Sequence, residues 1–373
     1  MNDKTADAID QARVSAIEQF MAGHNTAAVK SGTPAYFTEN SKPLHVEVIS
    51  TGSPALDVAL GVGGLPRGRI VEVYGPEHSG KTSLALSVCA QAIKAGGVAG
   101  FIDAEHAINF EHAKWLGVNT DYFVLCQPDY GEQALQQVEA MCLSDSFDII
   151  VVDSVSSLVP KAEMDGEIGD QFVGLQARMM SQALRRLQTV ASNTNTTLLF
   201  INQLREKIGV MYGNPETTSG GRALKFYSSV RLDVRSAAGA RIKEGKGDAE
   251  RIIGQVCKVK IQKNKVAPPF RKAEYRLMYG TGIDMAENLV SSATTLGVWA
   301  MKPGGTFIQT DTEEVIGRGK DNVAQLLRDD PQMLEQVRVA VLETLTAART
   351  YDAVTSPLTL DTTAGQPGES PAA

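Results

Sequence analysis

The stretch from Gly75 to Thr82 constrains the fold of this chain more than any other. It fits the pattern G-x-x-x-x-G-K-[ST] and reads Gly75-Pro76-Glu77-His78-Ser79-Gly80-Lys81-Thr82. A β-branched run, Ile70–Tyr74, precedes it, and the residues from Ser83 onward suit a buried helix. In this context the glycines let backbone N–H groups point at phosphate oxygens, and the helix dipole adds positive potential. Lys81 can bridge the β- and γ-phosphates while Thr82 offers its hydroxyl to Mg²⁺, so we expect a nucleoside triphosphate site.

Length and composition restrict the class of protein. The chain has 373 residues, which suggests two or three domains, and 43% of them are hydrophobic, enough for a sizeable core. A net charge of -7 argues against a protein that coats nucleic acid through an overall positive charge. Any contacts with DNA or RNA must therefore come from local basic patches. The four cysteines form no C-x-x-C pair and the five histidines show no metal-ligand spacing. We therefore expect buried thiols in a reducing cytoplasm and no metal besides nucleotide-bound Mg²⁺. The chain has no apolar run long enough to cross a bilayer, so we also expect no membrane span.

Strand and helix patterns alternate along the middle of the chain. This alternation predicts a doubly wound, mostly parallel α/β sheet with ligands at the carboxyl ends of its strands. The expected strands after the phosphate loop are Val98–Ile102, Phe123–Cys126, Asp148–Asp153, Thr197–Gln203, Val230–Val234, Gln255–Ile261 and Glu274–Met278, with helices at Gly131–Leu143 and Val173–Ser192.

Shifts in composition divide the chain into four expected parts. Residues 46–279 are expected to form the core that carries the nucleoside triphosphate site. Residues 280–351 are expected to form a small α+β domain that ends in a helix at Pro331–Ala348. Residues 352–373 are rich in Ser, Thr, Pro, Gly and Ala, which predicts a disordered tail. Residues 1–45 combine a helical pattern, Lys4–Met21, with a polar linker, and two interpretations stay open. The segment is either a frayed terminus or a helix that docks on a neighbouring subunit.

Three polar residues lie where expected strands end at the rim of the nucleotide site. Asp153 closes a continuously apolar strand, where its carboxylate can hold Mg²⁺ together with Thr82. Glu105 lies just past another strand and can orient or deprotonate the attacking water. Gln203 ends a third strand, and its amide can sense the γ-phosphate and change rotamer when that group is lost.

Two segments leave the same sheet edge. The first, Arg205–Arg222, is a long expected loop that mixes cations, glycines and apolar residues, and the second is Met164–Phe172. Loops this long inside a compact domain are usually functional. Cations and N–H groups suit phosphates, and apolar side chains can insert between bases. We therefore expect a nucleotide-dependent grip on a nucleic acid, with two ligand-free surface loops as the alternative.

A segment near the end of the expected core is rich in basic residues. Lys258–Lys265 alternates cations with apolar residues, which usually marks one solvated face. If subunits stack so that this face meets the next phosphate loop, Lys263 and Lys265 could act in trans as arginine fingers do.

Taken together, these stretches closely resemble the bacterial RecA recombinase family. The Ile208-Gly209-Val210-Met211 run, followed by Gly213–Thr218, is far more specific than the phosphate loop, which many ATPases share. The likeness is strong from Val46 to Tyr279 and weaker in the small C-terminal domain. The matching stretches, in order, are Gly75–Thr82, Phe101–Ala107, Val151–Ser154, Pro160–Asp170, Ala177–Gln182, Ile201–Gln203, Lys207–Gly221 and Lys263–Lys265.

The resemblance implies an ATP- and Mg²⁺-dependent filament on single-stranded DNA that pairs with a homologous duplex and exchanges strands. It implies that Glu105 and Gln203 serve catalysis and sensing, that Lys263 and Lys265 reach ATP from the adjacent protomer, and that Lys225 and Phe226 lie at that interface. It further implies self-cleavage of a LexA-like repressor in the DNA-damage response. The implied DNA-binding residues are Arg178, Ser181, Arg185, Arg205, Lys207, Ile208, Gly209, Val210, Thr217, Thr218, Gly220, Gly221 and Arg222.

Several positions depart from the family pattern. Asn109 and His112 stand where relatives usually carry Asp and Tyr beside the adenine, His78 replaces a small residue, and Arg222 replaces a common Asn. These departures suit a divergent or phage-borne member. The rival function is a hexameric ring helicase built on the same core. Two further alternatives are a regulatory ATPase that does not bind DNA and a degenerate family member that binds DNA but hydrolyses ATP poorly because of His78, Asn109 and His112.

Overall fold

The computed structural model describes residues 15–17, 19–20, 46–167, 170, 172, 174–206, 216–245 and 249–355. The chain forms two compact units, Met1–His45 and Val46–Ala373, which are described separately. In the first unit, residues 15–17 and 19–20 are helical, within the expected N-terminal helix. The rest of that helix and its linker lie outside the described residues.

A mixed sheet of ten strands forms the centre of the second unit in its described part, in the order β12-β11-β10-β9-β3-β7-β6-β4-β5, with β8 paired to β7. The pairs from β9 to β5 are parallel, whereas those from β9 to β12 are antiparallel. The strands are β3 Ile70–Gly75, β4 Ala99–Asp103, β5 Phe123–Cys126, β6 Ile149–Asp153, β7 Thr197–Glu206, β8 Glu216–Thr218, β9 Val230–Glu244, β10 Arg251–Asn264, β11 Lys272–Met278 and β12 Gly282–Ile283. This arrangement confirms the expected α/β class with a mostly parallel sheet.

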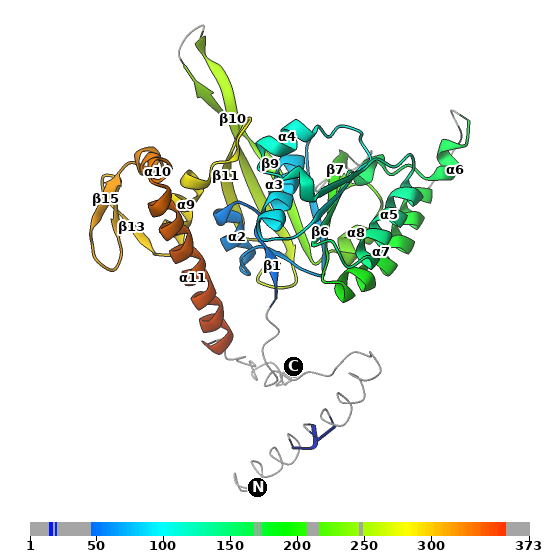
Figure 1. The fold of residues 1–373 in the computed structure, drawn as a ribbon, viewed down its shortest axis with the longest axis horizontal. Coiled ribbons are helices and arrows are strands. Elements are labelled where there is room, and N and C mark those ends of the chain that lie inside the picture. Colours follow the sequence, from blue (N-terminus) through cyan, green and yellow to red (C-terminus); the bar gives the residue numbers. More distant parts are fainter. Residues whose placement is uncertain are drawn as a thin grey trace, which may run out of the picture. The chain divides into compact units, whose positions relative to one another are not determined.

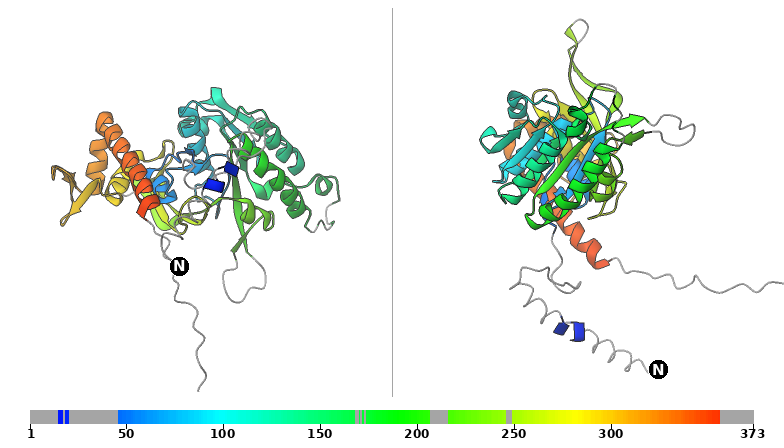
Figure 2. Two further views of the ribbon diagram at one scale, coloured as in Figure 1. Left: turned by 90° about the horizontal axis from the view of Figure 1, so that it is seen from below. Right: turned by 90° about the vertical axis from the view of Figure 1, so that its right-hand side faces the viewer.

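Helices cover both faces of the parallel strands (Figures 1 and 2). Side chains alternate along each strand, so Ile149 and Val151 pack into the core under α3, whereas Ile150 and Val152 pack under α5 and α7. Burial on both faces explains the continuous apolar run in the sequence. The helices of this region are α2 Pro54–Leu60, α3 Lys81–Lys94, α4 Phe110–Trp115, α5 Gly131–Leu143, α6 Lys161–Met164, α7 Leu175–Asn193 and α8 Ala223–Tyr227, with 3₁₀ turns η1 Thr120–Tyr122 and η2 Val155–Ser157.

The C-terminal part has its own core around Trp299, Phe307 and Leu327. A three-stranded antiparallel sheet, β13-β14-β15, packs with three helices there. Ser53 Oγ, in the small N-terminal elements of this unit, donates to Asn288 Oδ1 at 2.7 Å and joins the two regions. The remaining elements are β1 Val48–Ile49, β2 Leu65–Pro66, α9 Met285–Thr295, β13 Trp299–Lys302, β14 Thr306–Gln309, β15 Val315–Arg318, α10 Lys320–Asp329 and α11 Pro331–Thr355.

Several predicted element boundaries differ in the structure. Strands β9 and β10 are much longer than the short runs expected and form a two-stranded ribbon (Figure 1). The ribbon was not predicted because backbone pairing holds it, while its described side chains at 241–244 and 251–253 are exposed or half-buried. Arg205 and the residues Glu216–Thr218, expected in a loop, lie in paired strands, because pairing β7 with β8 satisfies their backbone groups. Helix α11 continues to Thr355, past the expected start of the disordered tail.

The cysteines differ in part from expectation. Cys89, Cys142 and Cys257 are buried, whereas Cys126 is half-buried. Cys126 ends β5, which has a neighbouring strand on one side only, so the edge leaves it partly open to solvent.

Candidate functional site

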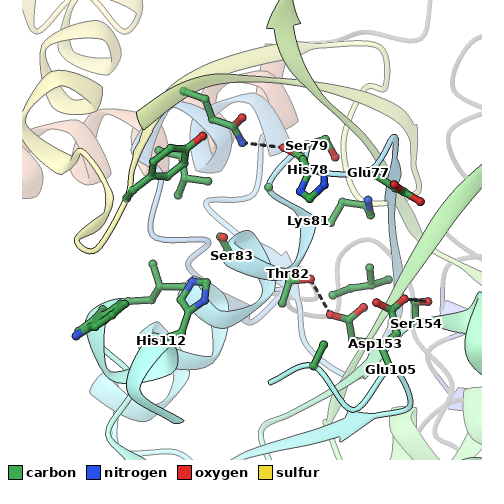
Figure 3. A pocket seen from close by; sticks show the side chains of 18 of the residues that line it. Glu77, His78, Ser79, Lys81, Thr82, Ser83, Glu105, His112, Asp153 and Ser154 are labelled. Atoms are coloured by element: carbon green, nitrogen blue, oxygen red, sulfur yellow. Dashed lines mark hydrogen bonds between the residues drawn. The ribbon is translucent and has the colours of Figure 1, made fainter. Parts of the chain in front are cut away.

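A cavity of about 740 Å³ opens at the carboxyl ends of β3, β4, β6 and β7 (Figure 3). This is the sheet edge where ligands of doubly wound folds bind. The expected phosphate loop lies on one side of the cavity, and the acidic and amide residues that follow the other strands face it. The lining residues are Glu77, His78, Ser79, Gly80, Lys81, Thr82, Ser83, Glu105, Ala107, His112, Trp115, Leu116, Asp153, Ser154, Ile201, Gln203, Gln255, Leu277, Met278, Tyr279 and Gly280.

The glycines of the phosphate loop are required by close packing. A Cβ on Gly75 would lie 1.9 Å from the carbonyl oxygen of Val234, which no side chain can tolerate. Gly80 caps α3 at a φ of +94°, a left-handed conformation that favours glycine. Lys81 Nζ donates to the carbonyl oxygen of Pro76 at 2.7 Å, and burial lowers the pKa of Lys81 below its ordinary value. The phosphate loop therefore presents the partly desolvated Lys81 ammonium group and the amino end of α3 to the cavity.

Two residues of β10 support this loop from behind, and the sequence pattern had not indicated them. Gln255 Nε2 donates to the carbonyl oxygen of His78 at 3.0 Å, and Cys257 Sγ donates to that of Ser79 at 3.5 Å. Peptide groups are rigid planes, so holding these carbonyls also sets the direction of the N–H groups that follow. No local signal marks Gln255 and Cys257, because only the antiparallel sheet extension brings β10 beneath the loop.

Thr82 and Asp153 meet at the base of the cavity. Thr82 Oγ1 donates to Asp153 Oδ2 at 2.7 Å. Burial raises the pKa of Asp153 to about 7, the hydrogen bond from Thr82 opposes this rise, and the nearby carboxylates of Glu105 and Asp103 add to it. Hydroxyl and carboxylate oxygens beside a phosphate loop are the ligands that Mg²⁺ prefers.

Glu105 accepts two hydrogen bonds at the same rim. Gln203 Nε2 donates to Glu105 Oε1 at 2.9 Å, and Ser154 Oγ donates to the same oxygen. Asp103, which is buried, shapes the turn that carries Glu105 by accepting from the backbone N–H groups of Ala107 and Ile108 at 3.2 and 3.0 Å. The structure thus brings together the acid and the amide that were predicted separately.

A buried polar network lies behind Gln203. The Asn202 side chain donates to Glu72 Oε1 and to the carbonyl oxygen of Ser219, both at 3.1 Å, and its Oδ1 accepts from the Gln203 N–H at 2.9 Å. Glu72 is fully buried and forms an ion pair with Arg231. The network joins the end of β7 to the segment that follows β8, a connection that sequence reasoning missed.

The opposite end of the cavity is aromatic and apolar, and Figure 3 shows His112 there, away from the phosphate loop. Asn109, expected beside the base, caps α4, where its Oδ1 accepts from the Glu111 N–H at 2.8 Å. It is not among the residues that line the cavity.

Some of the predicted DNA-binding residues lie on α7 or beside it. Arg178 and Arg185 are exposed on this helix, and Ser181 is half-buried. A Cβ on Gly221 would lie 2.8 Å from Ala177 Cβ, so this glycine lets the segment after β8 approach α7. Gly220 packs equally closely against Val155, while Arg222 is exposed at the start of α8. Residues 207–210 lie outside the described residues.

Lys263 and Lys265 are not at the cavity of their own chain. Asn264 pairs with Val230, and Val230 pairs with Val71, which places this end of β10 beside the amino end of β3, opposite the phosphate loop. Lys263 Nζ donates to the carbonyl oxygens of Lys225 and Phe226 at 2.7 and 3.0 Å.

Comparisons with known proteins agree with this geometry. Residues 29–284 match the RecA N-terminal domain family. The chain is 56% identical to Protein RecA of Thermus aquaticus over 300 residues, which covers 80% of this chain and 86% of that protein. It is 53% identical to Protein RecA of Chlorobaculum tepidum over 312 residues (84% and 88%) and 50% identical to Protein RecA of Symbiobacterium thermophilum over 342 residues (91% and 95%).

A helix that crosses a membrane needs a long stretch of apolar residues. Among the helices that the structure describes, none combines the length and the apolar character needed for a bilayer crossing.

Proposed function

The chain belongs to the RecA family, and from this premise we propose which of its residues bind ATP, hydrolyse it and hold DNA. The protein is an ATP-dependent DNA recombinase and a DNA-dependent ATPase that uses ATP with Mg²⁺. It binds single-stranded and double-stranded DNA and forms filaments. No observation favours the ring helicase considered from the sequence.

The phosphates of ATP bind the Gly75–Thr82 loop in this proposal, with Lys81 at the β- and γ-phosphates. The donors fit Mg²⁺, because the Thr82 hydroxyl and the Asp153 carboxylate lie 2.7 Å apart and nucleotide phosphates supply further oxygens. These two residues would hold the ion, which would neutralise charge on the phosphates.

Glu105 acts as the residue that orients or deprotonates the attacking water. Its contact with Gln203 is the observation that carries this assignment, because the γ-phosphate sensor and the acid share one hydrogen bond of 2.9 Å. Gln203 exchanges Glu105 for a γ-phosphate oxygen when ATP binds. Its neighbour Asn202 then transmits the change to Ser219 at the DNA-binding side.

Two further roles need a second molecule. Lys263 and Lys265 complete the ATP site of an adjacent protomer, which agrees with their distance from the loop in their own chain. The filament also promotes self-cleavage of a LexA-like repressor, and the protein works in the cytoplasm; both follow from the family resemblance. Incubating a purified repressor of this type with filaments tests the first of these, and absence of cleavage would refute it.

Substitution of Lys81 tests the ATP site. Lys81→Ala should abolish DNA-stimulated ATP hydrolysis, whereas Lys94→Ala, at the other end of α3, should leave it unchanged. Hydrolysis at the normal rate in Lys81→Ala would place the ATP site elsewhere. Electron microscopy with ATP and single-stranded DNA provides the second test, because open helical filaments agree with the assignment and closed rings contradict it.

A further inference from the structure

A chain of serine hydroxyl groups ends on the Glu105 carboxylate. Ser154 follows β6 and is fully buried, and its Oγ donates to Glu105 Oε1 (Figure 3). Ser156 lies in the η2 turn that comes next, and its Oγ is 2.6 Å from Ser154 Oγ. Ser157 Oγ, in the same turn, is farther from Ser154 Oγ, at 3.4 Å. Ser154 and Ser156 therefore form a line of short contacts that leads to Glu105.

The chemistry of its end groups fixes the direction of each hydrogen bond in this line. The Glu105 carboxylate can only accept, so the single hydroxyl hydrogen of Ser154 points at Glu105. Ser154 Oγ is then the acceptor for the hydroxyl group of Ser156. Hydrogen bonds that follow one another in this way polarise and strengthen each other. Ser156 therefore acts on Glu105 without touching it.

The two carboxylate oxygens of Glu105 have different surroundings. Oε1 accepts from Ser154 and Gln203, whereas Oε2 has no hydrogen-bond partner among the residues that the structure describes. Glu105 is exposed and lines the cavity, so Oε2 is open to a water molecule. In the proposed function, Gln203 leaves Glu105 for the γ-phosphate when ATP binds. The hydrogen bond from Ser154 then remains to fix the carboxylate that orients the water.

The turn that carries Ser156 is tied to the DNA-binding side of the protein. Gln176, in the first turn of α7, donates its side-chain Nε2 to the carbonyl oxygens of Val155 and Leu158 at 2.9 and 3.2 Å. Val155 begins η2 and Leu158 caps its end, so one amide group holds both ends of the turn. Arg178, a predicted DNA-binding residue, follows Gln176 on the same helix. A shift of α7 on DNA binding would therefore move the turn and its hydroxyl groups.

We propose that Ser154 and Ser156 are positioning residues for ATP hydrolysis, and that Gln176 couples them to DNA. Both roles rest on the proposed assignment of Glu105 as the residue that orients or deprotonates the attacking water. The two serines hold Glu105 Oε1 in the ATP-bound state, so that Oε2 faces the water. DNA bound along α7 sets the position of η2 through Gln176, and this adjusts the direction of the carboxylate.

Steady-state ATP hydrolysis by the full chain, at saturating single-stranded DNA, tests the two serines. Ser154→Ala should lower kcat about 10- to 100-fold, because a hydrogen bond to a charged group is lost. Ser156→Ala should lower kcat about two- to tenfold, and Ser156→Thr, which keeps a hydroxyl group, should restore it. Ser157→Ala is the matched control from the same turn and should keep the wild-type kcat, since its contact with Ser154 is long. The affinity for Mg²⁺–ATP, measured by calorimetry, should stay unchanged in all four variants.

The coupling to DNA has its own readout, which is the ratio of kcat with saturating DNA to the rate without DNA. Gln176→Ala should reduce this ratio by about fivefold or more, because η2 no longer follows α7. Gln188→Ala is the control, since Gln188 is exposed on the same helix, and it should keep the wild-type ratio.

Glu105→Gln separates the serine chain from the catalytic assignment on which it rests. Because Ser156 acts through Glu105, the double variant Glu105→Gln with Ser156→Ala should be no slower than Glu105→Gln alone. An unaltered kcat in Glu105→Gln would overturn the assignment of Glu105 and the serine chain with it. If Glu105→Gln is slow, the serine chain alone is overturned by a wild-type kcat in Ser154→Ala or Ser156→Ala, or by weakened ATP binding that accounts for their loss of activity. An unchanged ratio in Gln176→Ala would overturn the coupling to DNA.

Discussion

The buried ion pair between Glu72 and Arg231 allows a quantitative prediction. Glu72 is fully buried, the Arg231 side chain is 14% exposed, and the guanidinium lies 4.6 Å from the centroid of the Tyr74 ring. Glu72→Ala leaves this cation without its partner and removes one acceptor of Asn202. Loss of one partner from a buried pair destabilises a protein by about 3–5 kcal/mol. Because the Tyr74 ring and partial solvation compensate Arg231 in part, we expect about 3 kcal/mol.

Urea unfolding followed by circular dichroism, without nucleotide or DNA, measures this change as a shift of the midpoint. The double variant Glu72→Met with Arg231→Met should recover most of the loss, since it removes both charges together. Glu139→Ala, which breaks the partly exposed pair with Arg186, should change stability by less than about 1 kcal/mol. If Glu72→Ala unfolds within about 1 kcal/mol of the wild type, the pair does not stabilise the sheet as we infer.

Three further predictions concern catalysis, pH and salt. Glu105→Gln should lower kcat for DNA-stimulated ATP hydrolysis by about 100-fold or more while nucleotide affinity changes little, and an unaltered kcat would remove Glu105 from the chemistry. Burial raises the pKa of Asp57 from 3.8 to about 6, so its stabilising contribution is complete below pH 3.8 and is lost as the pH rises through 6. Asp57→Asn should therefore be more stable than the wild type by about 3 kcal/mol at pH 8 and equal to it near pH 4, and urea unfolding at both values checks this. Arg178→Ala should reduce the slope of log affinity for single-stranded DNA against log salt concentration by about 0.7, because one phosphate contact is lost. Arg186→Ala is the control and should leave the slope unchanged, since the Arg186 side chain pairs with Glu139. Equal slopes in the two variants would exclude a phosphate contact by Arg178.

Local patterns in the sequence were enough to predict the strands that end at Asp153 and Gln203, the strand before Glu105, and the phosphate loop. The run Ile149–Asp153 is apolar at every position until its last, because the strand is buried on both faces and ends at the sheet edge. Glu105 and Gln203 were also predicted to lie at that edge, since parallel strands bring their carboxyl ends together. Gly75–Thr82 was recognisable because phosphate binding demands glycine and lysine at a fixed spacing within one short segment.

Only the tertiary structure decided which distant residues support that segment. Gln255 and Cys257 reach the phosphate loop because β10 returns antiparallel beside β9, and no periodicity in the sequence specifies that return. Trp115 stands at the cavity because of the direction in which α4 leaves β4. Spacing along a chain encodes contacts within one strand or one helix, whereas the order of strands in a sheet depends on the packing of all of them at once.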